Sequence, residues 1–150
     1  MIAEESRGEA IRVRELEVWK ELEFVHASVV RQLDRALECD HGLTLHSFEL
    51  LSAIVSVPKV ELQMSDLAAR LQLTPSGVSR LVERLERDDL VVRVRNPRDR
   101  RVIHTNMTAS GSARLLEETK TYHAVVHEFF ARHFSPRKLS ACAKSCIAGQ

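Results

Sequence analysis

The sequence predicts a mainly α-helical protein with one small β-hairpin, and three observations support this fold class. The 150 residues include only five glycines and four prolines, so long stretches carry no helix breaker. Apolar residues recur at steps of three and four through most of the chain. Two short β-branched segments, 91–95 and 102–106, flank a turn that opens with Asn96-Pro97. At this length we expect one domain over residues 1–150.

The first helix is predicted over about residues 8–40, and His41-Gly42 ends it with a glycine beyond the last turn. Its apolar stripe is Leu16, Trp19, Leu22, Val25, Val29, Leu33 and Leu37. A helix of about 30 residues is about 45 Å long, more than a small globule can cover on one side. We therefore expect part of the stripe to pack against a second copy of the chain.

Three more helices are expected before the hairpin. The first covers about residues 46–57 and stops at Pro58. The second takes Ser65 as its N-cap, with Asp66 in the first turn. The third begins with Thr74 as N-cap and Pro75 at the first helical position. Only Gln72-Leu73 separates the last two helices, so they must cross sharply.

After the hairpin, two helices complete the chain. Thr108 is expected to cap a long helix over about residues 109–133, and Ser135-Pro136 opens a final helix. The predicted organisation is thus a lobe at about residues 45–107, with long helices at about 8–40 and 109–149 before and after it.

The positive charge of the chain is concentrated at the hairpin turn. Residues 93–101 hold five arginines and one aspartate, a local charge of +4, whereas the whole chain carries +1. A helix pair joined by a tight turn and followed by an arginine-tipped hairpin is the winged helix-turn-helix plan. The second helix of such a pair enters the DNA major groove. Ser76 and Ser79 can bond phosphates or bases there, Arg80 can grip a guanine, and Gly77 permits a close approach.

The stretches "LTLHSFELLSAI" and "MSDLAARLQLTPSGVSRLVERLERDDLVVRVRNPRDRRVIHTNMTASG" resemble the MarR family of bacterial transcription regulators. The resemblance covers nearly the whole chain and includes Asp99-Arg100-Arg101 in the wing and Met107-Thr108 before the next helix. It implies a cytoplasmic, nucleoid-associated homodimer that reads a pseudo-palindromic operator, as a repressor. One departure is Gln72, where many helix-turn-helix sequences carry glycine.

The resemblance also implies roles for the wing residues. Arg101 would reach the minor groove, Asp99 would brace it, and Arg98 and Arg100 would contact phosphates. With the helix residues and Arg95 of the first strand, the predicted DNA-binding set is Thr74, Ser76, Gly77, Ser79, Arg80, Arg84, Arg95, Arg98, Asp99, Arg100 and Arg101.

Members of this family are commonly released from DNA by a small molecule, often an aromatic acid or phenol. The candidate pocket residues here are Trp19, His26, His46 and Phe48. The alternative is that Trp19 belongs to a dimer core and that His26 is a half-buried histidine with satisfied hydrogen bonds.

Metal sensing and redox sensing have weaker candidates. His123 and His127 stand at the i, i+4 spacing that lets two imidazoles meet one metal ion, although surface histidines are the simpler interpretation. Cys142 and Cys146 share an apolar stripe typical of inert thiols, and Cys39 lies between Glu38 and Asp40, whereas a redox-sensing thiol needs positive neighbours. We expect no cofactor.

The sequence disfavours several classes of protein. No apolar run is long enough to span a bilayer, and the charged N-terminus does not resemble a signal peptide. No nucleophile–base pair, phosphate loop or carboxylate dyad is recognisable, so an enzyme is not expected. The rival hypothesis is a winged-helix module that docks other proteins, against which the clustered arginines argue.

Overall fold

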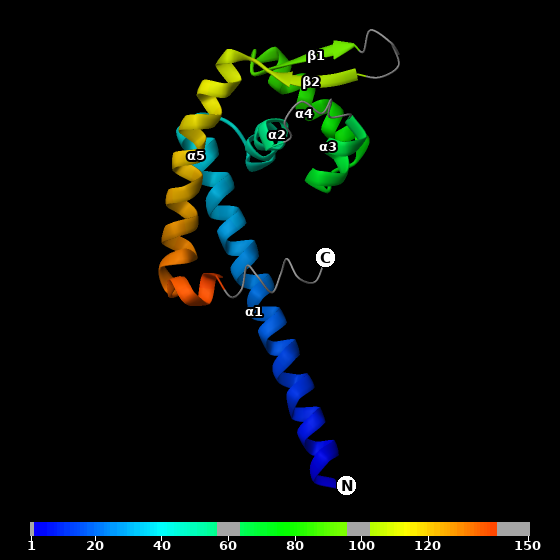
Figure 1. Cartoon of the computed structure of the whole chain (residues 1–150), viewed down its shortest axis with the longest axis vertical. Coiled ribbons are helices and arrows are strands. Elements are labelled where there is room, and N and C mark those ends of the chain that lie inside the picture. The colour runs from blue at the N-terminus through cyan, green and yellow to red at the C-terminus, as the bar shows by residue number, and fades with distance from the viewer. Residues whose placement is uncertain (1, 57–63, 96–102, 141–150) are drawn as a thin grey trace. The chain divides into compact units, whose positions relative to one another are not determined.

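The computed structural model describes residues 2–56, 64–95 and 103–140, with side chains described from Arg14 onward except at Ile103. Its elements in chain order are α1 (Ile2–His41), α2 (Leu45–Ser56), α3 (Met64–Leu71), α4 (Pro75–Arg87), β1 (Val91–Arg95), β2 (Ile103–Met107), α5 (Ala109–Phe129) and a 3-10 turn (Ala131–His133). Residues 136–140 are also helical. The predicted fold class, mainly helical with one hairpin, is confirmed (Figure 1). Among the described residues, no helix is both long and apolar enough to cross a membrane.

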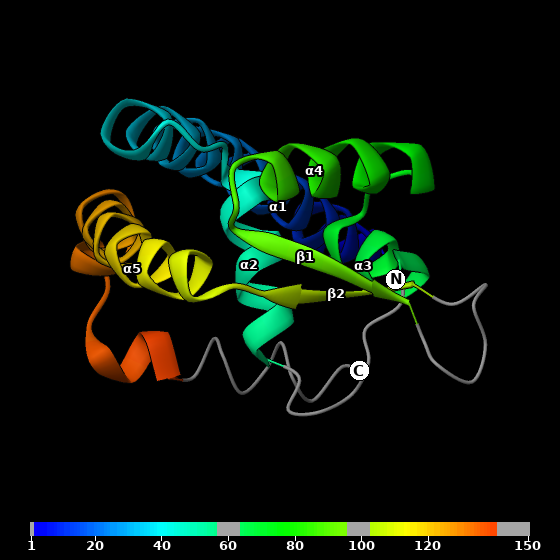
Figure 2. The same ribbon diagram turned by 90° about the horizontal axis from the view of Figure 1, so that it is seen from above.

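The chain forms two compact units, one of residues Asp34–Ala124 and the other of Met1–Leu33 with Val125–Gln150. The first unit holds the helix-turn-helix and the hairpin. Within it, α2, α3 and α4 gather beside the two strands (Figure 2). Their shared core consists of Leu43, Leu50, Leu51, Leu67, Ala68, Leu71, Val78, Val82, Leu85, Leu90 and Val91. Burial of this apolar surface is the main force that holds the helix pair against the hairpin.

The turn between α3 and α4 needs a left-handed backbone conformation, which is costly for any residue other than glycine. Gln72 has a φ of 52°, in the left-handed region that glycine adopts without penalty. The backbone N–H of Leu73 donates to the carbonyl of Ala68 at 3.1 Å, which closes the end of α3. Gly42 ends α1 in the same region, with a φ of 69° and its N–H donating to Glu38. Both helix ends therefore satisfy carbonyls that would otherwise lack a partner.

The strands pair antiparallel with Val91 opposite Met107 and Arg95 opposite Ile103. Thr108 caps α5 as predicted, because its hydroxyl oxygen accepts from the N–H of Gly111 at 2.9 Å. The same hydroxyl donates to the carbonyl of Asp89 at 2.6 Å, which ties the start of α5 to the turn before β1.

Several predicted boundaries need correction. Ser65 is not an N-cap, since α3 begins one residue earlier at Met64 and places Ser65 inside its first turn. The second strand ends at Met107 rather than at residue 106. The α-helix predicted to reach His133 ends at Phe129, and a 3-10 turn follows it. Sequence patterns predict that a helix exists more accurately than they predict the residue at which it ends, because helix ends fray or tighten into 3-10 turns.

The unit that contains residues 1–33 exposes much of its apolar surface. Trp19 is 59% exposed and Phe24 is 66% exposed. The other large apolar side chains exposed on this part of α1 are Leu16, Val18, Leu22 and Val25. Exposed apolar side chains in this number on one helix are typical of an interface with another chain.

Candidate nucleic-acid interface

Helix α4 carries a buried face and a polar face. Val78, Val82 and Leu85 are fully buried in the core. The opposite side carries Ser76, Ser79, Arg80, Glu83 and Arg87, of which all but the half-buried Ser79 are exposed. The helix is therefore anchored along one side and offers hydroxyls and charges along the other.

The start of α4 is fixed by its cap. Thr74 has an extended backbone, and its hydroxyl oxygen accepts from the N–H of Gly77 at 3.1 Å. A Cβ added at Gly77 would lie 3.2 Å from that same oxygen and 3.8 Å from Cβ of Leu73. The sequence predicts a close approach at this glycine. The structure shows that its nearest neighbours are the cap and the turn.

We expect Thr74→Ala to lower the free energy of unfolding by about 1 kcal/mol, because the N–H of Gly77 then loses its acceptor at a helix start. Thr74→Ser keeps the oxygen and should stay close to wild type. Urea denaturation of both variants measures the difference. Equal losses in the two would show that the methyl group, and not the cap, stabilises this turn.

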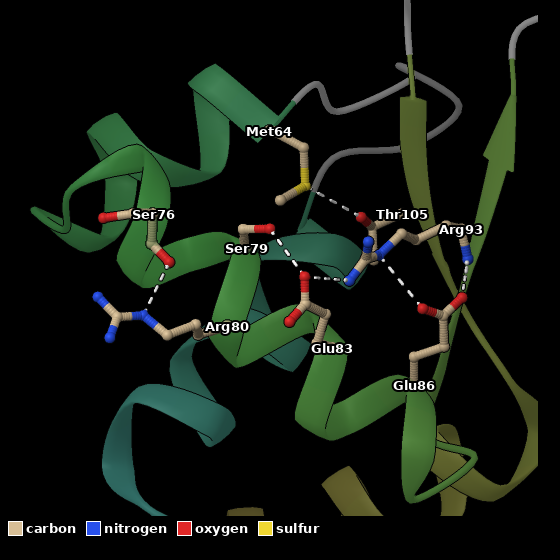
Figure 3. Close-up of polar contacts among 8 residues, drawn as sticks. All are labelled: Met64, Ser76, Ser79, Arg80, Glu83, Glu86, Arg93 and Thr105. Atoms are coloured by element: carbon tan, nitrogen blue, oxygen red, sulfur yellow. Dashed lines mark hydrogen bonds and ion pairs between the residues drawn. The ribbon is translucent and has the colours of Figure 1, made fainter.

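Arg80 is exposed on the polar face of α4. Its Nε lies 3.4 Å from the carbonyl oxygen of Ser76, one turn earlier on the same helix. Figure 3 shows the guanidinium extending from the helix on the side away from Arg93 and Glu86. The side chain is thus available for a partner outside the chain.

Arg84 is held inside the lobe. Its Nη2 donates to the hydroxyls of Thr44 at 2.9 Å and Ser47 at 2.6 Å, and Ser47 is fully buried at the start of α2. A DNA contact through Nη2 would require Arg84 to release both hydroxyls. The geometry therefore favours a positioning role, in which Arg84 fixes α4 against α2.

Two glutamates of α4 bind an arginine of the wing strand, a contact that the sequence did not reveal. Arg93 places Nη2 3.5 Å from Glu83 and Nε 3.2 Å from Glu86 (Figure 3). Its backbone N–H also donates to Glu86 at 3.2 Å. One of the five arginines counted in the basic cluster is therefore neutralised within the protein. The i, i+3 spacing of Glu83 and Glu86 is the sequence signal that could have indicated these ion pairs with Arg93.

Arg95 is exposed at the end of β1. The remaining predicted wing residues, Arg98, Asp99, Arg100 and Arg101, lie outside the described residues. So do Cys142 and Cys146.

The predicted pocket residues differ in their exposure. Trp19, His26 and His46 are exposed, whereas Phe48 is buried and stacks on Tyr122 with ring centroids 4.6 Å apart. Phe48 is thus part of the protein's own packing. Trp19 and His26 belong to the unit with residues 1–33, and the other two residues belong to Asp34–Ala124.

The candidates for metal and redox sensing are exposed where the structure describes them. His123 and His127 are exposed on α5. Across the described ranges, no group of three or more His, Cys, Asp or Glu side chains could hold a metal ion. Cys39 is an exposed free thiol.

Comparison with known proteins finds relatives of both the sequence and the fold. Residues 41–102, which contain α2 to β1 and the wing turn, match the model of the MarR family. Over 56 residues, the chain is 38% identical to the HTH-type transcriptional repressor MdtR of Bacillus subtilis (strain 168). That match covers 37% of this chain and about a third of MdtR, 36% of its length.

Solved structures extend the likeness to nearly the whole chain. AbsC, a MarR family transcriptional regulator from Streptomyces coelicolor, is 25% identical with a TM-score of 0.78, over 91% of this chain and 96% of AbsC. Sco3205 from the same organism, solved in complex with DNA, is 24% identical with a TM-score of 0.81, over 91% of this chain and 85% of that one. The family model, the match to MdtR and the fold agree: the chain is similar to the MarR family in sequence over residues 41–102 and in fold over most of its length.

Proposed function

We propose that this protein is a transcription regulator that binds double-stranded DNA through α4 and the β1–β2 wing. The observation that carries the proposal is the two-sided character of α4. On its apolar side Val78, Val82 and Leu85 are fully buried, and its polar side offers Ser76, Ser79 and Arg80 to a partner. A helix of this kind fits the major groove, where hydroxyls and arginine read base edges.

The charge distribution supports the same function. Arg93 is neutralised by Glu83 and Glu86, but Arg95 is exposed. The arginines at positions 98, 100 and 101 follow in the sequence at the wing turn. In the proposal they contact phosphates and the minor groove, with Asp99 bracing Arg101. The affinity should therefore fall steeply as salt rises.

The proposed assembly is a homodimer on a pseudo-palindromic operator, acting as a repressor. The exposed apolar side chains of α1, including Trp19 and Leu22, support a second copy as the partner of this helix. The two copies of α4 in a symmetric dimer would enter the major groove one DNA turn apart. Titration of a single operator with protein should then saturate at two chains per duplex.

Modulation by a small aromatic effector belongs to the same proposal. Trp19, His26 and His46 are exposed and can meet a ligand, whereas Phe48 would first have to leave Tyr122. We propose no enzymatic activity. A protein-docking module is the rival function, and it gives no reason for an exposed arginine beside two hydroxyls on α4.

DNA binding to the intergenic region beside the gene, measured at about 50 and 200 mM salt, tests the proposal. We expect selective binding that weakens with salt. Arg80→Ala should cost about 1–3 kcal/mol and relax one base position, whereas Arg101→Ala should weaken all sequences alike and lower the salt slope by about one unit. Arg137→Ala removes an exposed arginine far along the sequence and is the matched control. A folded protein without selective DNA binding would contradict the proposal and favour docking.

A further inference from the structure

Ser79 and Glu83 lie one turn apart on α4, and their side chains are joined by a hydrogen bond. The hydroxyl of Ser79 donates to Oε1 of Glu83 at 3.2 Å (Figure 3). The direction of this bond follows from the chemistry of the acceptor, because an ion-paired carboxylate has lone pairs and no proton to give. A serine hydroxyl has a single hydrogen. Ser79 therefore uses its only donor hydrogen within the protein, and its two lone pairs can accept from another partner.

The wing strand holds Glu83 in place from its other side. The oxygen that accepts from Ser79 is the same Oε1 that lies 3.5 Å from Nη2 of Arg93. Arg93 is itself fixed by Glu86, through its side chain at 3.2 Å and its backbone N–H at 3.2 Å. Arg93 thus contacts the carboxylate of Glu83 from the wing side, and this carboxylate alone sets the polarity of the Ser79 hydroxyl.

Ser76 is a useful contrast, because its hydroxyl is not committed in this way. It lies 3.2 Å from the hydroxyl of Thr74, and either group can be the donor. Ser76 can therefore donate to a phosphate oxygen or accept from a base. Ser79 has only the second option.

We propose that Ser79 determines base specificity by accepting a hydrogen bond from an amino group in the major groove, and that Glu83 is the positioning residue that imposes this polarity. This inference rests on the proposed DNA-binding function. In the major groove the amino donors are N6 of adenine and N4 of cytosine, whereas guanine and thymine offer oxygen acceptors at the corresponding positions. Phosphate oxygens are also acceptors. Ser79 therefore reads adenine or cytosine and does not serve as a phosphate contact.

Selection of binding sites from random-sequence DNA tests the inference with four proteins: wild type, Ser79→Ala, Glu83→Ala and Glu86→Ala. In wild type we expect one position of each half-site, read in one orientation, to be restricted to adenine or cytosine. Ser79→Ala should remove that restriction. Glu83→Ala should admit guanine and thymine at the same position, because the freed hydroxyl can then donate.

Glu86→Ala is the matched control. It removes the same charge from the same helix and also takes a carboxylate from Arg93, but it leaves the bond between Ser79 and Glu83 intact. Its selected site should equal that of wild type. A change shared by Glu83→Ala and Glu86→Ala would mean that charge or wing position, and not the polarity of Ser79, sets the preference, which overturns the inference.

A chemical substitution in the DNA gives a second measurement. Purine in place of adenine, or pyrimidin-2-one in place of cytosine, removes only the amino group. At the assigned position, wild type should lose about tenfold in affinity, as expected for one lost base contact. Ser79→Ala should not distinguish the two duplexes.

The remaining outcomes separate the two proposals. A restriction to guanine or thymine overturns the role of Ser79. A restriction that survives Ser79→Ala and disappears in Glu83→Ala means that Glu83 itself reads the base, which also overturns it. If wild type enriches no sequence while it remains folded, the proposed DNA-binding function fails, and this inference fails with it.

Discussion

Gly111→Ala is expected to destabilise the fold by about 2 kcal/mol or more, although it adds only one methyl group. A Cβ at this position would lie 2.0 Å from the backbone oxygen of Leu90 and 3.0 Å from Cγ of Met107. The oxygen cannot turn aside, because it accepts from the N–H of Thr108 at 3.1 Å. Overpacking of this kind costs about 1–3 kcal/mol or more, and the clash with the backbone places it at the upper end. The helix propensity of alanine offsets about 1 kcal/mol of that cost.

Urea denaturation measures the loss, and Ser112→Ala is the control. Ser112 is the next residue on α5 and is exposed, so its substitution should change the stability by less than about 0.5 kcal/mol. An equally small effect of Gly111→Ala would show that α5 moves away from Leu90 without cost. The close packing of the helix on the turn before β1 would then not be a constraint on the fold.

Gly111 also shows where sequence patterns stop being informative. Local patterns correctly predicted the helix pair, the hairpin, the caps at Thr74 and Thr108 and the end of α1 at Gly42. The caps and the end of α1 depend on residues within four positions of one another, and the hairpin joins two strands that are neighbours in the sequence. A glycine inside a predicted helix carries no local sign of the carbonyl that will lie against it, because Leu90 is 21 positions away.

The candidate interface also has features that local sequence patterns predict and features that they do not. Ser76, Ser79 and Arg80 could be placed on the polar face of α4 from their spacing alone. The partners of the arginines could not, since they depend on which elements come together. Arg84 meets hydroxyls at the start of α2, and Arg93 meets α4 across the turn. A cluster of arginines in a sequence therefore overstates the charge that a surface offers to DNA.

The other large effect comes from Glu118, an acidic residue with no accessible surface on α5. Burial raises the pKa of this carboxyl from 4.5 to about 7, and the guanidinium of Arg114, 3.6 Å away, lowers it only in part. Neither carboxyl oxygen accepts a hydrogen bond from a described residue. The folded protein thus favours the protonated form, whereas the unfolded chain ionises near its ordinary pKa.

The sign of the pH dependence follows from this difference. Between about pH 4.5 and 7 the unfolded state binds fewer protons at this site than the folded state, so stability falls as the pH rises. The loss is about 1.4 kcal/mol per pH unit, or about 3 kcal/mol in all, and it levels off above pH 7. The side chain of Glu118→Gln cannot ionise, so this variant should not show that loss of stability.

We therefore expect Glu118→Gln to be close to wild type near pH 5 and more stable than wild type by about 3 kcal/mol at pH 8. Denaturation at fixed protein concentration across pH 5–8 measures the difference. Glu117→Gln is the matched control, since Glu117 is the exposed neighbour that pairs with Lys120 at 2.7 Å. Its curve should run parallel to wild type. If the Glu118→Gln curve also runs parallel, the folded state ionises this carboxyl without cost, and Arg114 compensates the burial fully.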